Sequence, residues 1–498
     1  MKLGDSKGVG ALRFGLAFSL LCVVAFPSSV AYSDLIIRLK NGESVTLPYD
    51  RDEVKSMEFS DGKGGVYKKA AKPSEMERNE RSGKKRTGSG TIYVSNGPEL
   101  ARAIRAALPG DDIVLKPGKY NVKKIRIKNS GTKEKPIRVR SETRGAALLE
   151  TKAGAMLTVQ GSNWIFENLD MRGTCSPHQR CQHAFHIVGA ADNTVIRNNR
   201  MRDFNSMIKG NGKPYSHSTK DGKTEDSIRF PDNVVISGNY IYNTYPRDTG
   251  EPVNLIDVVG GKNWVIKSNF IADFQKLKGN HISYAAYLKG GSSDGIIEGN
   301  LVMCEWKSKG GVRLGLSLGG GGTGAKYCDG GAGNRTDGKC AIEHTNGILR
   351  NNIILNCPKD VGIYLNKAKN TRIYNNTLIN NNGIDVRFDT SSADIRNNIV
   401  FGGIRDRNGG THTEADNLTS GLFGSGPDDY FRDWPNADLA LKKEDGIVDK
   451  GARLGAVTED FCGNPRKDRK PDVGAIEYGA GKCDVRAVLR EAEAFGKQ

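Results

Sequence analysis

Short apolar runs, broken by polar residues, recur along most of the chain. Two or three apolar residues are followed by one or two polar ones, an asparagine and more apolar residues, as in WIFENLDM, VVISGNYI and GILRNNII. Such runs are too short and too polar for helices, and a motif repeated at intervals of 22 to 52 residues is typical of a solenoid. The repeated asparagines are Asn168, Asn199, Asn239, Asn269, Asn300, Asn352, Asn376 and Asn398.

A parallel β-helix accounts for this pattern. Each repeat supplies one rung of short strands, and rungs stack about 4.8 Å apart so that together they bury an apolar interior. Asparagine suits a sharp turn that needs left-handed geometry, and stacked asparagines can hydrogen-bond along a ladder. A helix predicted over residues 98–108, with Leu100, Ala101, Ile104 and Leu108 on one face, would cover the first rung.

Other patterns define the flanking regions. Basic residues, an apolar run over residues 14–26 and a Ser-x-Ala site predict a signal peptide over residues 1–31. Residues 32–60 hold two alternating runs around Asn41-Gly42 and predict a small β unit. Residues 61–90 are a charged linker, the β-helix spans residues 91–415, and residues 416–498 form an irregular segment with a terminal helix. No other segment is suited to crossing a membrane, so the mature chain would be periplasmic or secreted.

The cysteines support export. Eight remain after signal cleavage, an even number that favours disulfides in an oxidising compartment. Nearness in the sequence suggests the pairs Cys175–Cys181, Cys328–Cys340, Cys462–Cys483 and Cys304–Cys357, although spacing alone does not fix connectivity. The stretch CSPHQRCQHAFH could also hold zinc, but its cysteine spacing fits no usual zinc pattern, so a disulfide-closed loop is the preferred interpretation.

The chain is basic, with a formal net charge of +17. A basic exported protein can bind nucleic acid, anionic lipid or an acidic polysaccharide. No nucleic-acid motif accompanies the charge, and the predicted location favours the polysaccharide. A basic surface that serves only solubility is the alternative.

Five consecutive strands carry the candidate chemistry: VNLIDVV, YAAYLKG, VRLGLSL, VGIYLNK and GIDVRFD. Strict alternation would turn one set of side chains inward: Ile256, Val258, Ala286, Leu288, Leu314, Leu316, Leu318, Ile363, Leu365, Ile384 and Val386. The opposite set would form an outward stripe: Asp257, Tyr287, Lys289, Arg313, Ser317, Tyr364, Asn366, Asp385 and Arg387. A shift of one residue in this alignment would turn the stripe inside out.

The repeats over residues 91–415 resemble those of exported right-handed parallel β-helix proteins, which include polysaccharide lyases, glycoside hydrolases, epimerases and phage tailspikes. Residues 251–313 resemble the alginate lyase and chondroitinase B group, whose members use a lysine on one rung, an arginine on the next and calcium. Gly250-Glu251 is similar to the start of their calcium-binding strand, which implies Glu251 as a metal ligand, and Lys289 falls near the arginine position. This chain departs from the group at Val258 and Val253, where the lysine and a second acidic ligand would stand.

These residues predict an enzyme that cleaves an acidic polysaccharide by β-elimination. Lys289 would remove the proton beside the uronate carboxylate, Arg313 or Arg387 would neutralise that carboxylate, and Tyr287 or Tyr364 would exchange the second proton. Asp257, Tyr364, Asn366, Asp385 and Arg387 are the expected substrate-binding residues, with calcium a possible cofactor. A non-catalytic glycan-binding protein and a uronate C5-epimerase remain the alternatives.

Overall fold

The structure is a computed structural model that describes residues 2–3, 33–38, 44–49, 57–58, 88–218, 224–320, 322–329, 334–419, 426–467 and 469–496. The chain divides into two compact units, residues 1–74 and residues 75–498. In the first unit, strands β2 (Ser33–Arg38) and β3 (Ser44–Tyr49) pair antiparallel, while β1 (Lys2–Leu3) pairs with β4 (Met57–Glu58). The predicted turn at Asn41-Gly42, most of the predicted signal peptide and most of the linker lie outside the described residues.

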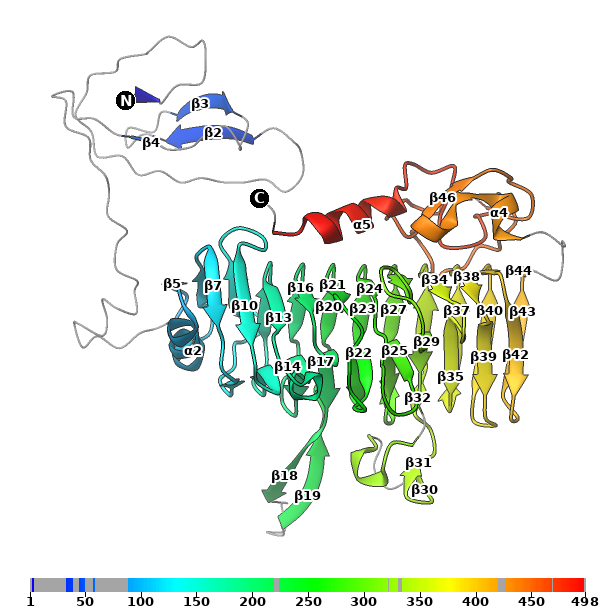
Figure 1. Cartoon of the computed structure of the whole chain (residues 1–498), viewed down its shortest axis with the longest axis horizontal. Coiled ribbons are helices and arrows are strands. Elements are labelled where there is room, and N and C mark those ends of the chain that lie inside the picture. Colours follow the sequence, from blue (N-terminus) through cyan, green and yellow to red (C-terminus); the bar gives the residue numbers. More distant parts are fainter. Residues whose placement is uncertain are drawn as a thin grey trace. The chain divides into compact units, whose positions relative to one another are not determined.

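The second unit is a column of stacked rungs, as predicted (Figure 1). Its three parallel sheets run along the column, and each rung adds one strand to each sheet. Sheet 1 contains β5 (Thr91–Val94), β6 (Asp112–Leu115), β9 (Ile137–Ser141), β12 (Trp164–Glu167), β15 (Val195–Arg197), β20 (Val235–Ser237), β23 (Val265–Lys267), β27 (Ile296–Glu298), β33 (Ile348–Arg350), β37 (Thr371–Tyr374), β40 (Ser392–Arg396) and β43 (Thr411–Ala415). Aliphatic and aromatic side chains from all three sheets fill the interior.

The other two sheets complete each rung. Sheet 2 contains β7 (Gly118–Asn121), β10 (Ala147–Thr151), β13 (Asp170–Gly173), β16 (Arg200–Arg202), β21 (Tyr240–Tyr242), β24 (Phe270–Ala272), β28 (Leu301–Met303), β34 (Ile353–Cys357), β38 (Thr377–Asn381), β41 (Ile399–Val400) and β44 (Leu418–Thr419). Sheet 3 contains β8 (Ile125–Ile127), β11 (Ala155–Val159), β14 (His183–Val188), β17 (Ser206–Asn211), β22 (Val253–Val259), β25 (Ile282–Lys289), β29 (Val312–Leu318), β35 (Ile363–Asn366), β39 (Gly383–Arg387) and β42 (Gly403–Arg407).

The predicted asparagine ladder lies at the turn from sheet 1 to sheet 2. Side-chain amides donate to the next asparagine at 2.9–3.0 Å in the order Asn199, Asn239, Asn269, Asn300, Asn352, Asn376, Asn398 and Asn417. Two details of the prediction are wrong. The left-handed residue is the one before each ladder asparagine, such as Asn198 or Asn375, and Asn168 occupies that earlier position. Leu169 therefore takes the ladder position of its rung and donates its backbone N–H to Asn199.

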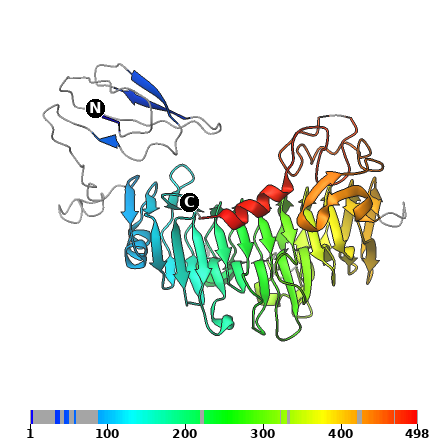
Figure 2. The same cartoon turned by 45° about the horizontal axis from the view of Figure 1, so that its top comes forward.

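Both ends of the sequence of this unit cover the column. Helix α2 (Gly97–Ala106) packs Leu100 and Ile104 against the first rung, and Asn96 caps its N-terminus by accepting from the Glu99 N–H. The segment from residue 426 onward lies along the outside of sheet 2, and helix α5 (Val485–Ala494) follows the column in both views (Figures 1 and 2). This segment also contains α4 (Pro427–Tyr430), β45 (Phe431–Asp433) and β46 (Asp438–Leu441), and its apolar side chains bury those that sheet 2 turns outward.

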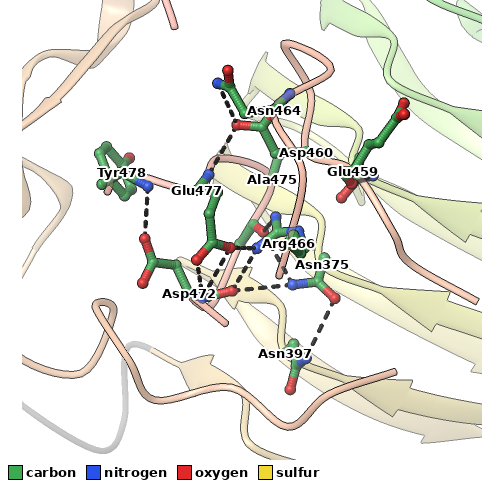
Figure 3. Close-up of polar contacts among 12 residues, drawn as sticks. Asn375, Asn397, Glu459, Asp460, Asn464, Arg466, Asp472, Ala475, Glu477 and Tyr478 are labelled. Atoms are coloured by element: carbon green, nitrogen blue, oxygen red, sulfur yellow. Dashed lines mark hydrogen bonds and ion pairs between the residues drawn. The ribbon is translucent and has the colours of Figure 1, made fainter. Parts of the chain in front are cut away.

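A buried network of charges fixes this C-terminal segment (Figure 3). Arg466 donates to Glu477 at 2.5 Å and to the backbone oxygens of Asp472 at 3.0 Å and Gly474 at 2.7 Å. The side chains of Arg466 and Glu477 are only 3% and 4% exposed. Asn375 of the column donates to the same Asp472 oxygen at 3.1 Å, so the network also ties the segment to the β-helix.

Two insertions interrupt the turns from sheet 3 to sheet 1. The first is a hairpin of β18 (Lys213–Ser218) and β19 (Thr224–Arg229), and the second carries β30 (Arg335–Thr336) and β31 (Lys339–Cys340). Figure 1 shows both on the same side of the column. Short strands β26 (Ser292–Ser293), β32 (His344–Thr345) and β36 (Ala368–Lys369) pair along the same turns.

Four disulfides join the pairs that nearness in the sequence suggested: Cys175–Cys181, Cys304–Cys357, Cys328–Cys340 and Cys462–Cys483. Cys175–Cys181 uses both cysteines of the zinc alternative. None of the helices in the described part of the chain has the length and hydrophobicity needed to span a membrane.

Candidate active site

The outer faces of the three sheets differ in how far their charged side chains are already covered or paired within the protein. Sheet 2 is covered by the C-terminal segment. On sheet 1, arginines pair with acids on neighbouring strands, as Arg197 does with Glu167 and Arg350 with Glu298, both at 2.5 Å. Sheet 3 turns polar side chains away from the core that are only partly engaged, although several of them, such as Asp257 and Tyr287, are only 6% and 4% exposed. A functional site is best sought there.

Strand pairing on sheet 3 aligns one outward side chain per rung. These side chains form a row along the column, in which each residue pairs with the next on the neighbouring strand. We refer to this set as the outer row: Arg126, Thr158, His186, Lys209, Asp257, Tyr287, Ser317, Tyr364, Asp385 and Arg405. Lys289 stands two residues beyond Tyr287 and is paired with Val259. The predicted outward positions of Asp257, Tyr287, Ser317, Tyr364 and Asp385 are therefore confirmed.

Four residues of adjacent strands form the centre of the row, and we refer to Lys209, Asp257, Tyr287 and Lys289 as the central cluster. Lys209 Nζ lies 2.6 Å from Asp257 Oδ1. Lys289 Nζ lies over the Tyr287 ring, 4.7 Å from its centroid, and the Tyr287 hydroxyl accepts a hydrogen bond from Asn254 at 3.0 Å. No hydrogen bond or ion pair joins the Lys289 amine to another residue that the structure describes.

Burial and charge shift the acid–base behaviour of this cluster. Burial lowers the pKa of Lys289 from its ordinary value, and Lys209 lowers it further against the opposing effect of Asp257. Burial would raise the pKa of Asp257, but Lys209 and Lys289 outweigh it, so that pKa lies below its usual value. Burial and the Asp257 carboxylate raise the pKa of Tyr287 well above its usual range. The cluster thus favours a carboxylate, a protonated phenol and an amine that loses its proton unusually easily.

Glycine and a buried glutamate position Lys289. A Cβ atom at Gly320 would lie 2.7 Å from the Lys289 Cδ, so only glycine leaves room for the lysine stem. The Glu343 carboxylate accepts from the Gly290 N–H at 2.7 Å and from the Thr323 hydroxyl at 2.8 Å. It thereby holds the residue after Lys289 against the second insertion.

The structure does not place Arg313 in the stripe. Its side chain is 2% exposed, and it donates to the backbone oxygens of Gly310 and Cys304 and lies 3.7 Å from Asp273. Leu314, predicted to face inward, instead packs outside with Tyr364 and Val361. Both predictions were wrong, and Arg313 cannot contact a substrate on this face.

The cause is a kink that crosses sheet 3. Strand pairing skips one residue in each of β11, β14, β17, β22, β25 and β29. The skipped residue and its successor are both buried, as in Leu255-Ile256 and Ala285-Ala286. Two successive inward residues reverse the alternation before the kink. Arg313 and Leu314 precede the kink at Gly315, whereas the confirmed residues follow it.

Three more predicted residues lie beyond Ser317. Tyr364 accepts hydrogen bonds from Asn366 and from Arg387, each at 3.1 Å, so these three side chains form one group on the same face. Asp385 is 1% exposed and is paired with Arg405 at 2.8 Å and Arg407 at 2.6 Å. Its charge is neutralised within the protein, which leaves Tyr364, Asn366 and Arg387 as the candidate substrate contacts there.

The donor set does not fit the calcium site that the resemblance implied. Glu251 is exposed ahead of β22, Val253 is buried in the core, and Asp257 is already paired with Lys209. No group of three or more His, Cys, Asp or Glu side chains suited to a metal occurs in the described part of the chain. We therefore derive no catalytic step through calcium.

The sequence analysis missed the four residues of the outer row that precede Asp257. Lys209 and His186 stand in SMIKGN and HAFHIV, which show the same alternation as the five strands that were aligned. His186 Nε2 lies 2.6 Å from Asn211 Oδ1, and burial lowers its pKa below the usual value. Burial and His186 lower the pKa of His183 to about 4. Extending the alignment by two rungs would have found these side chains.

Comparison with known proteins agrees with the fold. The family model described as Chondroitinase B matches residues 94–206. The crystal structure of pectate lyase Pel9A has a TM-score of 0.52 at 13% identity, covering 78% of this chain and 96% of that one. An alginate lyase from Paenibacillus sp. str. FPU-7 has a TM-score of 0.41 at 16% identity, covering 68% and 96%. A comparison with curated protein sequences found no match. Over residues 94–206 the chain is therefore similar to chondroitinase B, and it shares its β-helix fold with pectate lyase Pel9A.

Proposed function

We propose that the protein is an exported polysaccharide lyase that cleaves a uronic-acid-containing polysaccharide by β-elimination. The observation that carries the proposal is the Lys289 amine, which has a lowered pKa, faces outward beside Asp257 and lies over the Tyr287 ring. It forms no hydrogen bond or ion pair with another residue that the structure describes. A general base needs such a group, because a neutral amine within reach of the substrate can accept a proton. The resemblance to polysaccharide lyases and the shared fold support the same reaction class.

In the substrate, the C5–H and C4–O4 bonds break, and a C4=C5 double bond and a new O4–H bond form. Neutral Lys289 takes the proton from C5 of the uronate, the electron pair forms the C4=C5 double bond, and the C4–O4 bond breaks. Tyr287 supplies the proton to O4, since its raised pKa keeps the phenol protonated at neutral pH. The resulting lysinium and tyrosinate stand on the same face of β25, and transfer of the proton between them restores both groups.

Substrate binding falls to the rest of the outer face of sheet 3. Lys209 is the cation nearest to Asp257 and Lys289, and in this proposal it takes the role in neutralising the uronate carboxylate that the sequence had given to Arg313. Tyr364, Asn366 and Arg387 would bind sugar units further along the column. The four disulfides favour folding in an oxidising compartment, in keeping with the predicted signal peptide.

The test is a panel of acidic polysaccharides that includes alginate, pectate, glucuronan and glycosaminoglycans. Ultraviolet absorbance from unsaturated uronate on at least one of them is the expected result. Exchange of the C5 proton with solvent without chain cleavage would instead identify an epimerase. Retention on a glycan column with neither reaction would identify a binding protein, and both outcomes would overturn the lyase proposal.

A further inference from the structure

A basic cavity lies beside the N-terminal half of the outer row. It has a volume of about 490 Å³ and is bounded by strands β8, β11, β14 and β17, by the hairpin β18–β19, and by Tyr327 of the second insertion. The two insertions thus contribute to one cavity, although Ile228 of the first and Tyr327 of the second lie 99 positions apart in the sequence. A side wall of this kind is expected where a groove has to hold an extended ligand.

The charges of the cavity are of one sign. Lys124, Arg126 and Lys213 line it and are exposed, and none of them forms an ion pair with another described residue. The described lining contains no aspartate or glutamate. Three exposed cations gathered without a carboxylate make the potential of the cavity positive, which attracts an anionic ligand.

The remaining lining supplies neutral polar groups. Gln160 adds an amide group, and the lowered pKa of His186, caused first by burial, keeps its imidazole neutral near neutral pH. The Asn211 side chain is held by His186 and by the Gly212 backbone oxygen, so it forms part of the wall. Tyr327 contributes an aromatic ring. Hydroxyl groups pair with neutral amides and imidazoles, and sugar rings pack on aromatic faces, so the lining matches a charged sugar better than an inorganic ion.

We propose that this cavity is a subsite for an anionic sugar unit remote from the cleaved bond. The proposal rests on the proposed function and extends it to chain-length specificity. Arg126 and Tyr287 occupy the same row and are separated by five strand spacings, which is about 24 Å along the column. The near edge of the cavity, at Asn211, lies two strand spacings from Lys289, or about 10 Å, because Val259 pairs with both residues. Arg126 marks the far end, so only a chain that extends several sugar units beyond Lys289 reaches this arginine, and shorter oligosaccharides do not contact it.

The test compares long and short chains of one glycan. In the double variant Arg126→Ala/Lys213→Ala, we expect KM for the long chain to rise about tenfold or more, while kcat/KM for oligosaccharides too short to reach the cavity stays unchanged. The control Lys267→Ala/Lys369→Ala removes the same charge from exposed positions outside the cavity and should change neither value. An equal loss for long and short chains, or no loss for long chains, would overturn the proposal.

A binding measurement separates this proposal from the proposed function. Affinity electrophoresis in gels that contain alginate or a sulfated glycosaminoglycan needs no cleavage. Retardation should weaken in the Arg126→Ala/Lys213→Ala variant and persist in the control, and the gel that shows the difference identifies carboxylate or sulfate as the recognised group. Equal retardation of the two variants in both gels would refute the subsite even if the protein proves to be a lyase. A difference between them would support the subsite even if no glycan is cleaved.

Discussion

The buried charges of the C-terminal segment and those of the central cluster differ in how many of their polar atoms have a hydrogen-bond partner. In the C-terminal segment, Arg466 is held by Glu477 and by two backbone oxygens, and Glu477 in turn accepts from the Asp472 N–H. In the central cluster, Asp257 is engaged by Lys209, whereas the Lys289 amine contacts only the Tyr287 ring. The first arrangement anchors a segment to the column. The second leaves a titratable group available on an open face, so we assign structure to one and chemistry to the other.

The largest expected effect is on activity, from Lys289→Ala. Loss of a general base typically lowers kcat by about 10²- to 10⁴-fold. Thermal stability should change little, because the amine forms no hydrogen bond or ion pair with a described residue and loses only its contact with the Tyr287 ring. The control Lys267→Ala removes an exposed lysine of sheet 1 and should leave turnover intact. Near-normal turnover by Lys289→Ala would remove Lys289 as the base.

Arg466→Met should show the opposite behaviour. Removing one partner of a buried pair leaves Glu477 uncompensated and costs about 3–5 kcal/mol of the free energy of unfolding. Activity per folded molecule should be unchanged, because the segment that holds the network packs against sheet 2, whereas the central cluster lies on sheet 3. Denaturant unfolding together with a rate normalised to folded protein tests this. A stable variant with reduced kcat would contradict the assignment.

Glu343→Gln should fall between these two variants. The amide loses carboxylate contacts to the Gly290 N–H and to Thr323, so the turn after Lys289 is less firmly held. We expect kcat to fall about 10- to 100-fold with little change in KM, since misplacing a catalytic group slows the reaction more than it weakens binding. Thr336→Ala, at an exposed position of the same insertion, is the matched control. A rise in KM with unchanged kcat would place Glu343 in substrate binding instead.

The pH dependences of activity and stability should separate. Lys289 must be neutral to act as a base, so the rate should rise with pH and level off below the ordinary pKa of lysine. Burial lowers the pKa of His344 to about 3 and that of His183 to about 4. Below about pH 6.5 these two histidines bind protons in the unfolded chain but not in the folded protein. The free energy of unfolding therefore falls by about 1.4 kcal/mol for each pH unit of acidification and for each histidine, until the pKa of the folded state is reached.

His344→Gln tests the stability half of that prediction. It should flatten the acid-side slope of the unfolding free energy without moving the pH–rate profile, because His344 contacts Ser292 and does not touch the central cluster. His281→Gln at an exposed position is the matched control. An unchanged slope in His344→Gln would show that this imidazole does not resist protonation.

Sequence periodicity predicted the column because each rung repeats the same pattern of short apolar strands and turns. Apolar residues at alternate positions fixed the inward side chains such as Ile256 and Leu288, and with them the outward Asp257, Tyr287 and Lys289. The predicted alternation of inward and outward side chains was wrong at Arg313, because the kink places two adjacent residues inward. Pairs such as Ala285-Ala286 cannot be distinguished from an ordinary strand in the sequence. Lys209 was missed because the aligned strands began at residue 253. The cavity was not predictable, since it requires two distant insertions to meet.

The central claim is that the Lys289 amine has an unusually low pKa and lies on the surface that faces the substrate. Competitive acetylation of the intact protein over a range of pH, read by mass spectrometry, measures the titration of Lys289 and uses Lys267 as an internal reference. We predict that Lys289 becomes reactive at a lower pH than Lys267, and that an oligosaccharide of the cleaved glycan protects Lys289 alone. Parallel titration of the two lysines, or a Lys289 that the glycan does not protect, would contradict the claim.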